Sequence, residues 1–186
     1  MSLQRYPLSH PPILVAVTLD DHGRRCLEYA WQLAARRKEP LLVAHVVHET
    51  PRNAGMYQRR NRGHALLPLQ EIARTLLAQF LEDFRHDRPE LAAVEVQALV
   101  VSGLPAGRIP EIARATRSSL LVIGKRREAQ RWRRLLHGSV SRAVLRHAPC
   151  PVLLVDALGN PVSPPDPPPG LTEVRPRPGA SALNAP

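Results

Sequence analysis

The sequence predicts an α/β protein with a doubly wound, five-stranded parallel sheet and helices on both faces. Short apolar runs of strand length recur along the chain, and several contain no charged residue, which is typical of parallel strands covered on both sides. Segments with apolar residues at helical spacing separate these runs. Because strands and helices alternate, the crossovers should be right-handed and the strands parallel.

The first half of the chain predicts one β-α-β unit, followed by a long loop and a second helix. Residues 13–17 (ILVAV) should form the central strand, and residues 41–47 (LLVAHVV) should form its neighbour. Between them, the apolar residues of segment 21–38 recur at helical spacing. The polar and basic segment 48–64 is predicted to be a loop, whereas the apolar positions between 66 and 84 step by three or four and predict a helix.

The second half predicts three further strands. Residues 94–101 (VEVQALVV) begin with period-two alternation, which indicates a strand at a sheet edge. A short helix leads to residues 119–124 (SLLVIG), a buried strand that ends in glycine. The last helix should run from Gly138 to about His147, and a Pro-Cys-Pro segment then introduces the final strand, Val152 to Val155.

One domain, residues 12–156, is expected between two extensions, because a length of 186 residues suits a single core. The N-terminal extension, residues 1–11, has no apolar run that resembles a signal peptide, and no apolar run of the chain is long enough to span a bilayer. We therefore expect no membrane span and a cytoplasmic location. Residues 157–186 contain nine of the twenty prolines and no periodic apolar pattern, which predicts a disordered, Pro-rich tail.

The formal net charge of +10 favours polyanionic partners such as nucleic acid, nucleotide phosphates or an anionic membrane surface. The alternative is that the arginines are simply solvated. One basic cluster stands out, with Trp132 available for base stacking: Lys125, Arg126, Arg127, Arg131, Arg133, Arg134, Arg142 and Arg146. No recognition-helix, RRM or zinc-finger pattern accompanies it.

The histidines and cysteines give little support for catalysis. Cys26 and Cys150 lack any spacing that could chelate zinc and are interpreted as small apolar residues, so no metal site can be assigned. His45 lies in a predicted buried strand, which favours a core role, and His137 adjoins the glycine-containing loop. There is no G-x-S-x-G motif and no paired-carboxylate or Ser-His-Asp pattern, so a binding protein is expected rather than an enzyme, with slow ATPase activity left open.

Ligands of doubly wound sheets bind beyond the carboxyl ends of the strands, at the point where the strand order reverses. In this chain that rule selects the neighbourhood of Thr18, Val46 and Gly124, each of which lies at or just after the end of a predicted strand.

The segment LLVIGKRREAQRWRRLLHGSVSRAVLRHAPCPVLLV resembles the universal stress protein family in its strand, glycine loop, Gly-Ser-Val-Ser helix start and Pro-Cys-Pro-Val final strand. ILVAV, the pair His45-Val46 and VVSGLPAGRIPEIA match weaker signatures of the family in the same order. The resemblance covers about residues 12–156. It implies an adenine nucleotide alpha-hydrolase-like fold, a role as a stress-response regulatory protein, and a homodimer that pairs the final strands, Val152 to Val155.

In nucleotide-binding members of that family, a loop with two glycines and a later Gly-Ser or Gly-Thr pair wraps the phosphates of ATP. Glycines let backbone amides approach oxygen atoms closely, and a helix N-terminus presents free N–H groups to an anion. Arg127 stands where the second glycine belongs, and the loop is one residue longer. Arg127 either blocks the close approach or binds phosphate itself. The resemblance assigns the phosphate contacts to Gly124, Arg127, Gly138, Ser139, Val140 and Ser141.

A second departure concerns the adenosine end of the site. Nucleotide-binding members commonly place an aspartate after the first strand, where this chain has Thr18. A contact from the backbone of Val46 to adenine would survive, because it does not depend on the side chain. We therefore expect weak or selective binding of ATP or another adenine nucleotide. The alternative is a nucleotide-independent dimeric module that binds nucleic acid or protein partners through its arginine-rich face.

Overall fold

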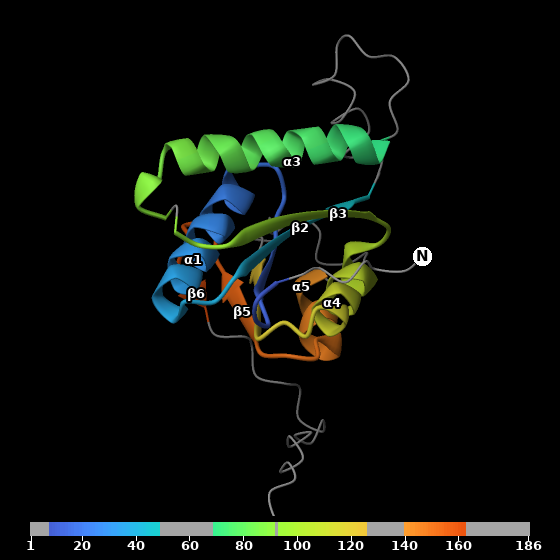
Figure 1. The fold of residues 1–186 in the computed structure, drawn as a ribbon. Helices are drawn as coiled ribbons and strands as arrows, with labels where there is room; N and C mark the ends of the chain where they lie inside the picture. The colour runs from blue at the N-terminus through green and yellow to red at the C-terminus, as the bar shows by residue number, and fades with distance from the viewer. Residues whose placement is uncertain (1–7, 49–68, 92, 126–139, 163–186) are drawn as a thin grey trace, which may run out of the picture.

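The structure is a computed structural model that describes residues 8–48, 69–91, 93–125 and 140–162. A single sheet with the strand order β3-β2-β1-β4-β5-β6 forms its centre (Figure 1). The strands are β1 (Ile13–Ala16), β2 (Leu41–Val47), β3 (Val96–Ser102), β4 (Leu120–Gly124), β5 (Val152–Val155) and β6 (Pro161–Val162). The helices are α1 (Asp21–Arg37), α3 (Leu69–His86), the 3-10 helix η1 (Pro89–Leu91), α4 (Pro105–Ala115) and α5 (Val140–His147).

The α/β class and the doubly wound parallel arrangement are confirmed, with β1 at the centre as the sequence predicts. Strands β1 to β5 pair in parallel, and β3 lies at one edge, where the alternating pattern places it. The expected count of five strands is wrong, because β6 pairs with β5 in antiparallel orientation. Leu154 is level with Val162, and Val155 with Pro161.

Strand β6 lies within the segment predicted to be a structureless tail, and a tight turn holds it there. The carboxylate of Asp156 accepts hydrogen bonds from the backbone N–H groups of Leu158 (2.8 Å) and Asn160 (2.9 Å). Gly159 has a φ of 91°, a conformation that glycine adopts without strain. The prediction of disorder from residue 157 onward is therefore wrong for this hairpin, because an Asx-type turn and two ladder positions order the chain despite its composition.

Two helical layers cover the sheet, one on each face (Figure 1). Helices α1 and α3 enclose a core that includes Trp31, Leu77 and Phe84, all of them fully buried. Helices α4 and α5 enclose a second core, with Ile112 and Val144 packed on the other face of β1 and β4. Because β1 and β4 are buried on both faces, their sequences are continuous apolar runs rather than alternating ones.

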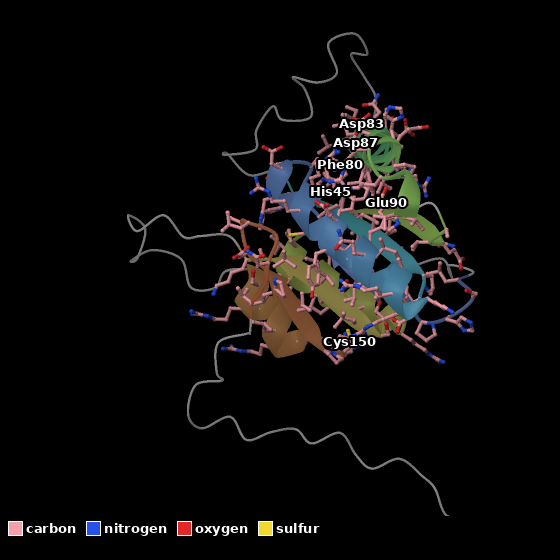
Figure 2. The ribbon with its side chains drawn as sticks, turned by 90° about the vertical axis from the view of Figure 1, so that its left-hand side faces the viewer. His45, Phe80, Asp83, Asp87, Glu90 and Cys150 are labelled. Carbon is pink, nitrogen blue, oxygen red and sulfur yellow. The ribbon has the colours of Figure 1, made fainter. Side chains whose placement is uncertain are left out.

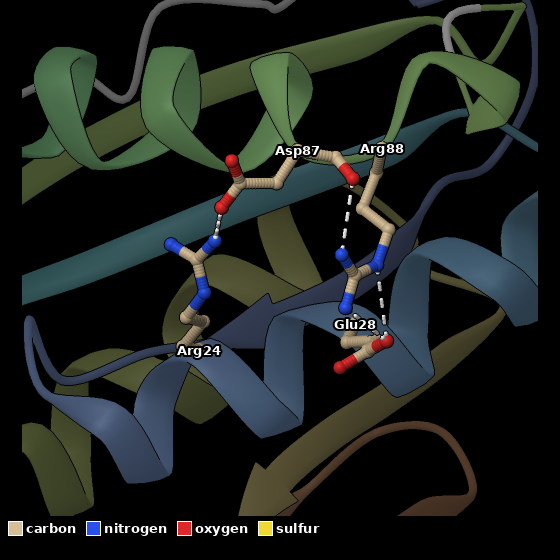
Figure 3. Close-up of polar contacts among 4 residues, drawn as sticks. All are labelled: Arg24, Glu28, Asp87 and Arg88. Carbon is tan, nitrogen blue, oxygen red and sulfur yellow. Dashed lines mark hydrogen bonds and ion pairs between the residues drawn. The ribbon is translucent and has the colours of Figure 1, made fainter.

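Aromatic and polar contacts join α1 to α3 and η1. Trp31 stacks on Phe84 with ring centroids 5.1 Å apart, and its indole N–H donates to the carbonyl of Leu91 at 2.9 Å. Two ion pairs also link α1 to the end of α3 and the residues just after it, Arg24 with Asp87 and Arg88 with Glu28 (Figure 3). The ion pairs are partly exposed, so the buried ring contact and the indole hydrogen bond contribute more to the packing of these helices.

The connection from β1 to α1 depends on a glycine. Asp20 caps the helix by accepting from the backbone N–H of Gly23 at 2.9 Å. A Cβ atom on Gly23 would lie closer than 3.0 Å to three backbone atoms of Thr18. Because backbone atoms cannot move aside as a flexible side chain can, only glycine lets α1 begin this close to the end of β1.

We expect Gly23→Ala to destabilise the fold by about 3 kcal/mol, the upper range for an overpacked site. Gly107→Ala is the matched control, because Gly107 lies within α4 and a Cβ there would meet no atom within 4 Å. That variant should gain about 0.5–1 kcal/mol from helix propensity. Urea unfolding measures both, and equal stability of the Gly23→Ala variant and the parent chain would contradict the steric argument.

Candidate functional site at the carboxyl ends of the strands

The topology brings three of the predicted site residues to one edge of the sheet. Ala16 in β1 is level with Ala44 in β2 and Ile123 in β4, so the ends of these strands lie side by side. Thr18 follows β1, Val46 lies near the end of β2, and Gly124 is the last residue of β4. The strand order reverses between β1 and β4, and this is the position where doubly wound sheets bind ligands.

The start of α5 also lies at this edge. The hydroxyl of Ser141 donates to the carbonyl oxygen of Gly124 at 3.2 Å, and Val140, the first residue of the helix, is exposed. The N–H groups of the first turn of a helix have no partners within the helix, so this end can receive an anion. Three further predicted contacts, Arg127, Gly138 and Ser139, lie outside the described residues.

Thr18 is occupied with an internal contact. Its hydroxyl donates to Asp20 at 2.6 Å, through the same carboxylate oxygen that caps α1. Asp20, the residue that caps α1, therefore also engages the side chain that follows β1.

His22 is a member of this edge that the sequence analysis missed. Its two ring nitrogens are buried, and neither has a hydrogen-bond partner among the described residues. A Cβ atom added to Gly124 would lie closer than 3.0 Å to Nε2 of His22 and 3.0 Å from the sulfur of Cys26. The lack of a side chain at Gly124 thus makes room for the imidazole ring. The sequence did contain a sign that His22 points inward, because His22 lies one helical turn before Cys26 on the apolar stripe of α1.

His45 has a core role, as its place in a buried strand indicates. The side chain is 4% exposed, and Nδ1 lies 2.9 Å from the carbonyl oxygen of Val17. Burial lowers the pKa of His45, while the hydrogen bond to Val17 and the charge of Asp20 act in the opposite direction. The ring is therefore neutral at neutral pH, with Nδ1–H donating to the carbonyl.

Both cysteines are protonated thiols rather than nucleophiles. Burial, assisted by the negative charge of Asp20, raises the pKa of Cys26 to about 12. Burial also raises the pKa of Cys150, which lies between α5 and β5. Among the described residues, no group of three or more metal-ligating side chains gathers in one place. None of the described helices is long and apolar enough to cross a membrane.

The sequence model of the universal stress protein family matches residues 10–156. The chain belongs to this family. A universal stress protein of Thermus aquaticus, described by its place in the QAH/OAS sulfhydrylase 3' region, is 31% identical over 144 residues, which cover 77% of this chain and 96% of the relative.

Solved universal stress proteins share the fold. One, determined in complex with cAMP, superposes with a TM-score of 0.56 at 22% identity and covers 79% of this chain and 97% of its own. Another, from Archaeoglobus fulgidus in complex with dAMP, gives a TM-score of 0.53 at 23% identity, covering 78% and 97%. The family match ends at Asp156, so the turn and strand β6 of this universal stress protein lie beyond it.

The contact between Gly124 and His22 gives a second stability prediction. Gly124→Ala alone should destabilise the fold by about 1–3 kcal/mol, because the new methyl group overlaps the imidazole ring. Adding His22→Ala removes the overlapping ring, so the double variant should recover most of that loss. Urea unfolding of the four proteins in this cycle measures the coupling. Strictly additive losses would mean that something other than His22 requires a glycine at this position.

Proposed function

We propose that this universal stress protein is a regulatory binding protein of the stress response that holds an adenine nucleotide at the carboxyl ends of β1, β2 and β4. The observation that carries the proposal is the Ser141–Gly124 hydrogen bond, which fixes the start of α5 at the end of β4. Two proteins of the same fold were determined in complex with the adenine nucleotides cAMP and dAMP, which supports this class of ligand.

The phosphate end of the site fits such a ligand. Strand β4 ends in Gly124, and the first turn of α5 offers N–H groups and the positive end of a helix dipole beside it. In the proposal Val140 and Ser141 contact the phosphates together with Gly138 and Ser139, and Arg127 supplies a guanidinium in place of the family glycine.

The adenosine end fits less well. The backbone of Val46 remains available to the adenine ring, but Thr18 replaces the acidic residue and its hydroxyl already donates to Asp20. We therefore propose weak or selective binding. The described residues also favour binding without turnover, because the Cys26 thiol has a pKa of about 12 and the His45 ring is buried and neutral.

Calorimetric titration with ATP at low and moderate salt tests the proposal. Gly138→Asp should abolish the binding heat, because it adds a negative charge two residues before the first residue of α5. Thr18→Asp, which restores the acidic residue of nucleotide-binding relatives, should tighten binding about tenfold, the effect of one hydrogen bond to a charged group. Gly107→Ala is the control, since Gly107 lies in α4, away from these contacts, and should leave binding unchanged.

The other outcomes are equally informative. A parent chain that gives neither binding heat nor a thermal shift at saturating ATP contradicts the proposal. If the parent gives no heat while Arg127→Gly binds, the nucleotide pocket persists and Arg127 blocks it. Binding that survives Gly138→Asp places the phosphates elsewhere.

We also propose a homodimer through β5, with one correction to the sequence prediction. The edge from Val152 to Val155 is not open along its whole length, because β6 pairs with Leu154 and Val155. These two residues are buried, whereas Val152 and Leu153 are half-buried. The side chain of Arg25 donates to the carbonyl of Ala157 and ties the intervening turn to α1. A second copy can therefore pair with the first half of β5 only, unless β6 leaves.

Two truncations test this dimer. Ending the chain after residue 156 removes β6, whereas ending it after residue 162 keeps β6 and removes the rest of the tail. The shorter chain should dimerise about thirtyfold more tightly, since two ladder positions become available at about 1 kcal/mol each. The longer truncation should match the full chain. Sedimentation velocity measures the dimer affinity of both, and identical affinity in all three chains would show that Leu154 and Val155 do not take part in the interface.

A further inference from the structure

The α4–α5 layer of this protein carries an excess of positive charge, whereas α3 and the turn after it carry an excess of negative charge. The segments of the α4–α5 layer, residues 103–119 and 140–151, hold five arginines and one acidic residue, Glu111. The segment of α3 and the turn after it, residues 69–95, holds six acidic residues and three arginines. Figure 2 shows three of the acidic residues, Asp83 in α3, Asp87 just after it and Glu90 in η1, on the opposite side of the molecule from Cys150.

We define the basic face as Arg114, Arg117, Arg142, Arg146 and His147, which are all exposed. Two packed helices carry it, and a hydrogen bond from Arg114 to the carbonyl of His147 (3.5 Å) joins their C-terminal ends. The fifth arginine of the layer, Arg108, is left out because it pairs with Glu111 at 2.6 Å. The basic cluster predicted at residues 125–134 is separate and, apart from Lys125, lies outside the described residues.

A purely structural role explains part of this face. Cations in the last turn of a helix interact favourably with its dipole, which accounts for Arg114 in α4 and Arg146 in α5. The same dipole disfavours Arg142, which lies in the first turn of α5, and does not involve Arg117, which follows the end of α4. Helix stabilisation therefore accounts for Arg114 and Arg146 but not for the presence of Arg117 and Arg142 in the same layer.

The chemistry of the basic face fits a phosphate backbone. Its fixed charges are all arginines, whose planar guanidinium groups bind phosphate through two parallel hydrogen bonds. Membrane insertion requires apolar side chains among the cations. In this layer the exposed large hydrophobic side chains of the described residues, Leu104 and Val140, lie at the N-terminal ends of the helices, and Arg114 and Arg146 lie at the C-terminal ends. Of the basic face, Arg142 alone is close in sequence to one of them, Val140.

The absence of aromatic side chains from this layer favours double-stranded over single-stranded nucleic acid. Residues 103–119 and 140–151 contain no Phe, Tyr or Trp on which unpaired bases could stack. We propose that the basic face binds the phosphate backbone of double-stranded nucleic acid, without reading its base sequence. Such binding is driven by the release of counterions from the duplex, and it weakens as the salt concentration rises.

Fluorescence anisotropy with a short labelled DNA duplex tests this proposal on the full chain. The parent should bind at low salt, and its affinity should fall steeply between about 50 and 200 mM NaCl. The triple variant Arg114→Gln, Arg117→Gln, Arg146→Gln should lose at least about tenfold in affinity. The slope of log K against log salt should flatten by about 0.9 for each phosphate that the variant no longer neutralises.

The control triple is Arg36→Gln, Arg37→Gln, Lys38→Gln. It removes the same charge from the C-terminal end of α1, in the opposite layer, and Lys38 has a φ of 55°, close to the 51° of Arg117. The control should change the affinity by less than about twofold, the size of a long-range charge effect on an exposed surface. Circular dichroism of both triple variants tests whether each one folds.

Four results would overturn the proposal. The first is that the parent chain does not bind duplex at low salt, and the second is that both triples lose the same affinity for duplex. The third is that the Arg114, Arg117 and Arg146 triple keeps the affinity of the parent. The fourth is that this triple loses binding to phosphatidylglycerol vesicles while its affinity for duplex is unchanged. Equal losses would mean that net charge alone matters, and an unchanged affinity would place binding on other cations. The vesicle result would make a membrane the partner. The proposal is supported if the parent chain and the control triple prefer duplex over vesicles and the Arg114, Arg117 and Arg146 triple does not.

Discussion

The close approach of α1 to the ends of β1 and β4 is the constraint on which the site depends. Two positions without side chains permit it, Gly23 against the backbone of Thr18 and Gly124 against the ring of His22. With the helix seated there, Trp31 reaches Phe84 of α3 and the carbonyl of Leu91, so one layer closes over the sheet. The edge where the strand order reverses then lies directly beside the first turn of α1.

The same approach determines the electrostatics of the edge. Asp20 caps α1 and accepts a hydrogen bond from the hydroxyl of Thr18. Its charge adds to the burial that raises the pKa of Cys26, and it opposes the burial that lowers the pKa of His45. One carboxylate thus serves the helix start and the two titratable groups behind it. Asp20 therefore stabilises the start of α1 through its contacts with Thr18 and Gly23.

The sequence predicted the parallel strands well because apolar, β-branched runs such as residues 13–17 have few alternatives in a chain of this length. It missed β6 because two residues show no periodicity and the surrounding prolines dominate the composition, although Asp156 and Gly159 were usable turn signals. The sequence allowed two explanations for a glycine at position 124, a turn after the strand or a contact with a ligand. The packing of His22 against it is a tertiary contact between α1 and β4, which no local pattern encodes. The phosphate contacts Arg127, Gly138 and Ser139 remain predictions.

Helix α5 connects the two proposed binding regions. It begins beside Gly124, where the nucleotide phosphates are proposed to bind, and ends at Arg146 and His147 of the basic face. A helix this short moves as a unit, so a ligand that shifts its first turn also shifts its last. By linkage, any such coupling acts in both directions: a nucleotide that alters affinity for a polyanion must have its own affinity altered by the same factor. In the other layer, Trp31, Phe84 and two ion pairs hold α1 and α3 together. Among the described residues, no helix of that layer reaches both the proposed nucleotide site and the basic face.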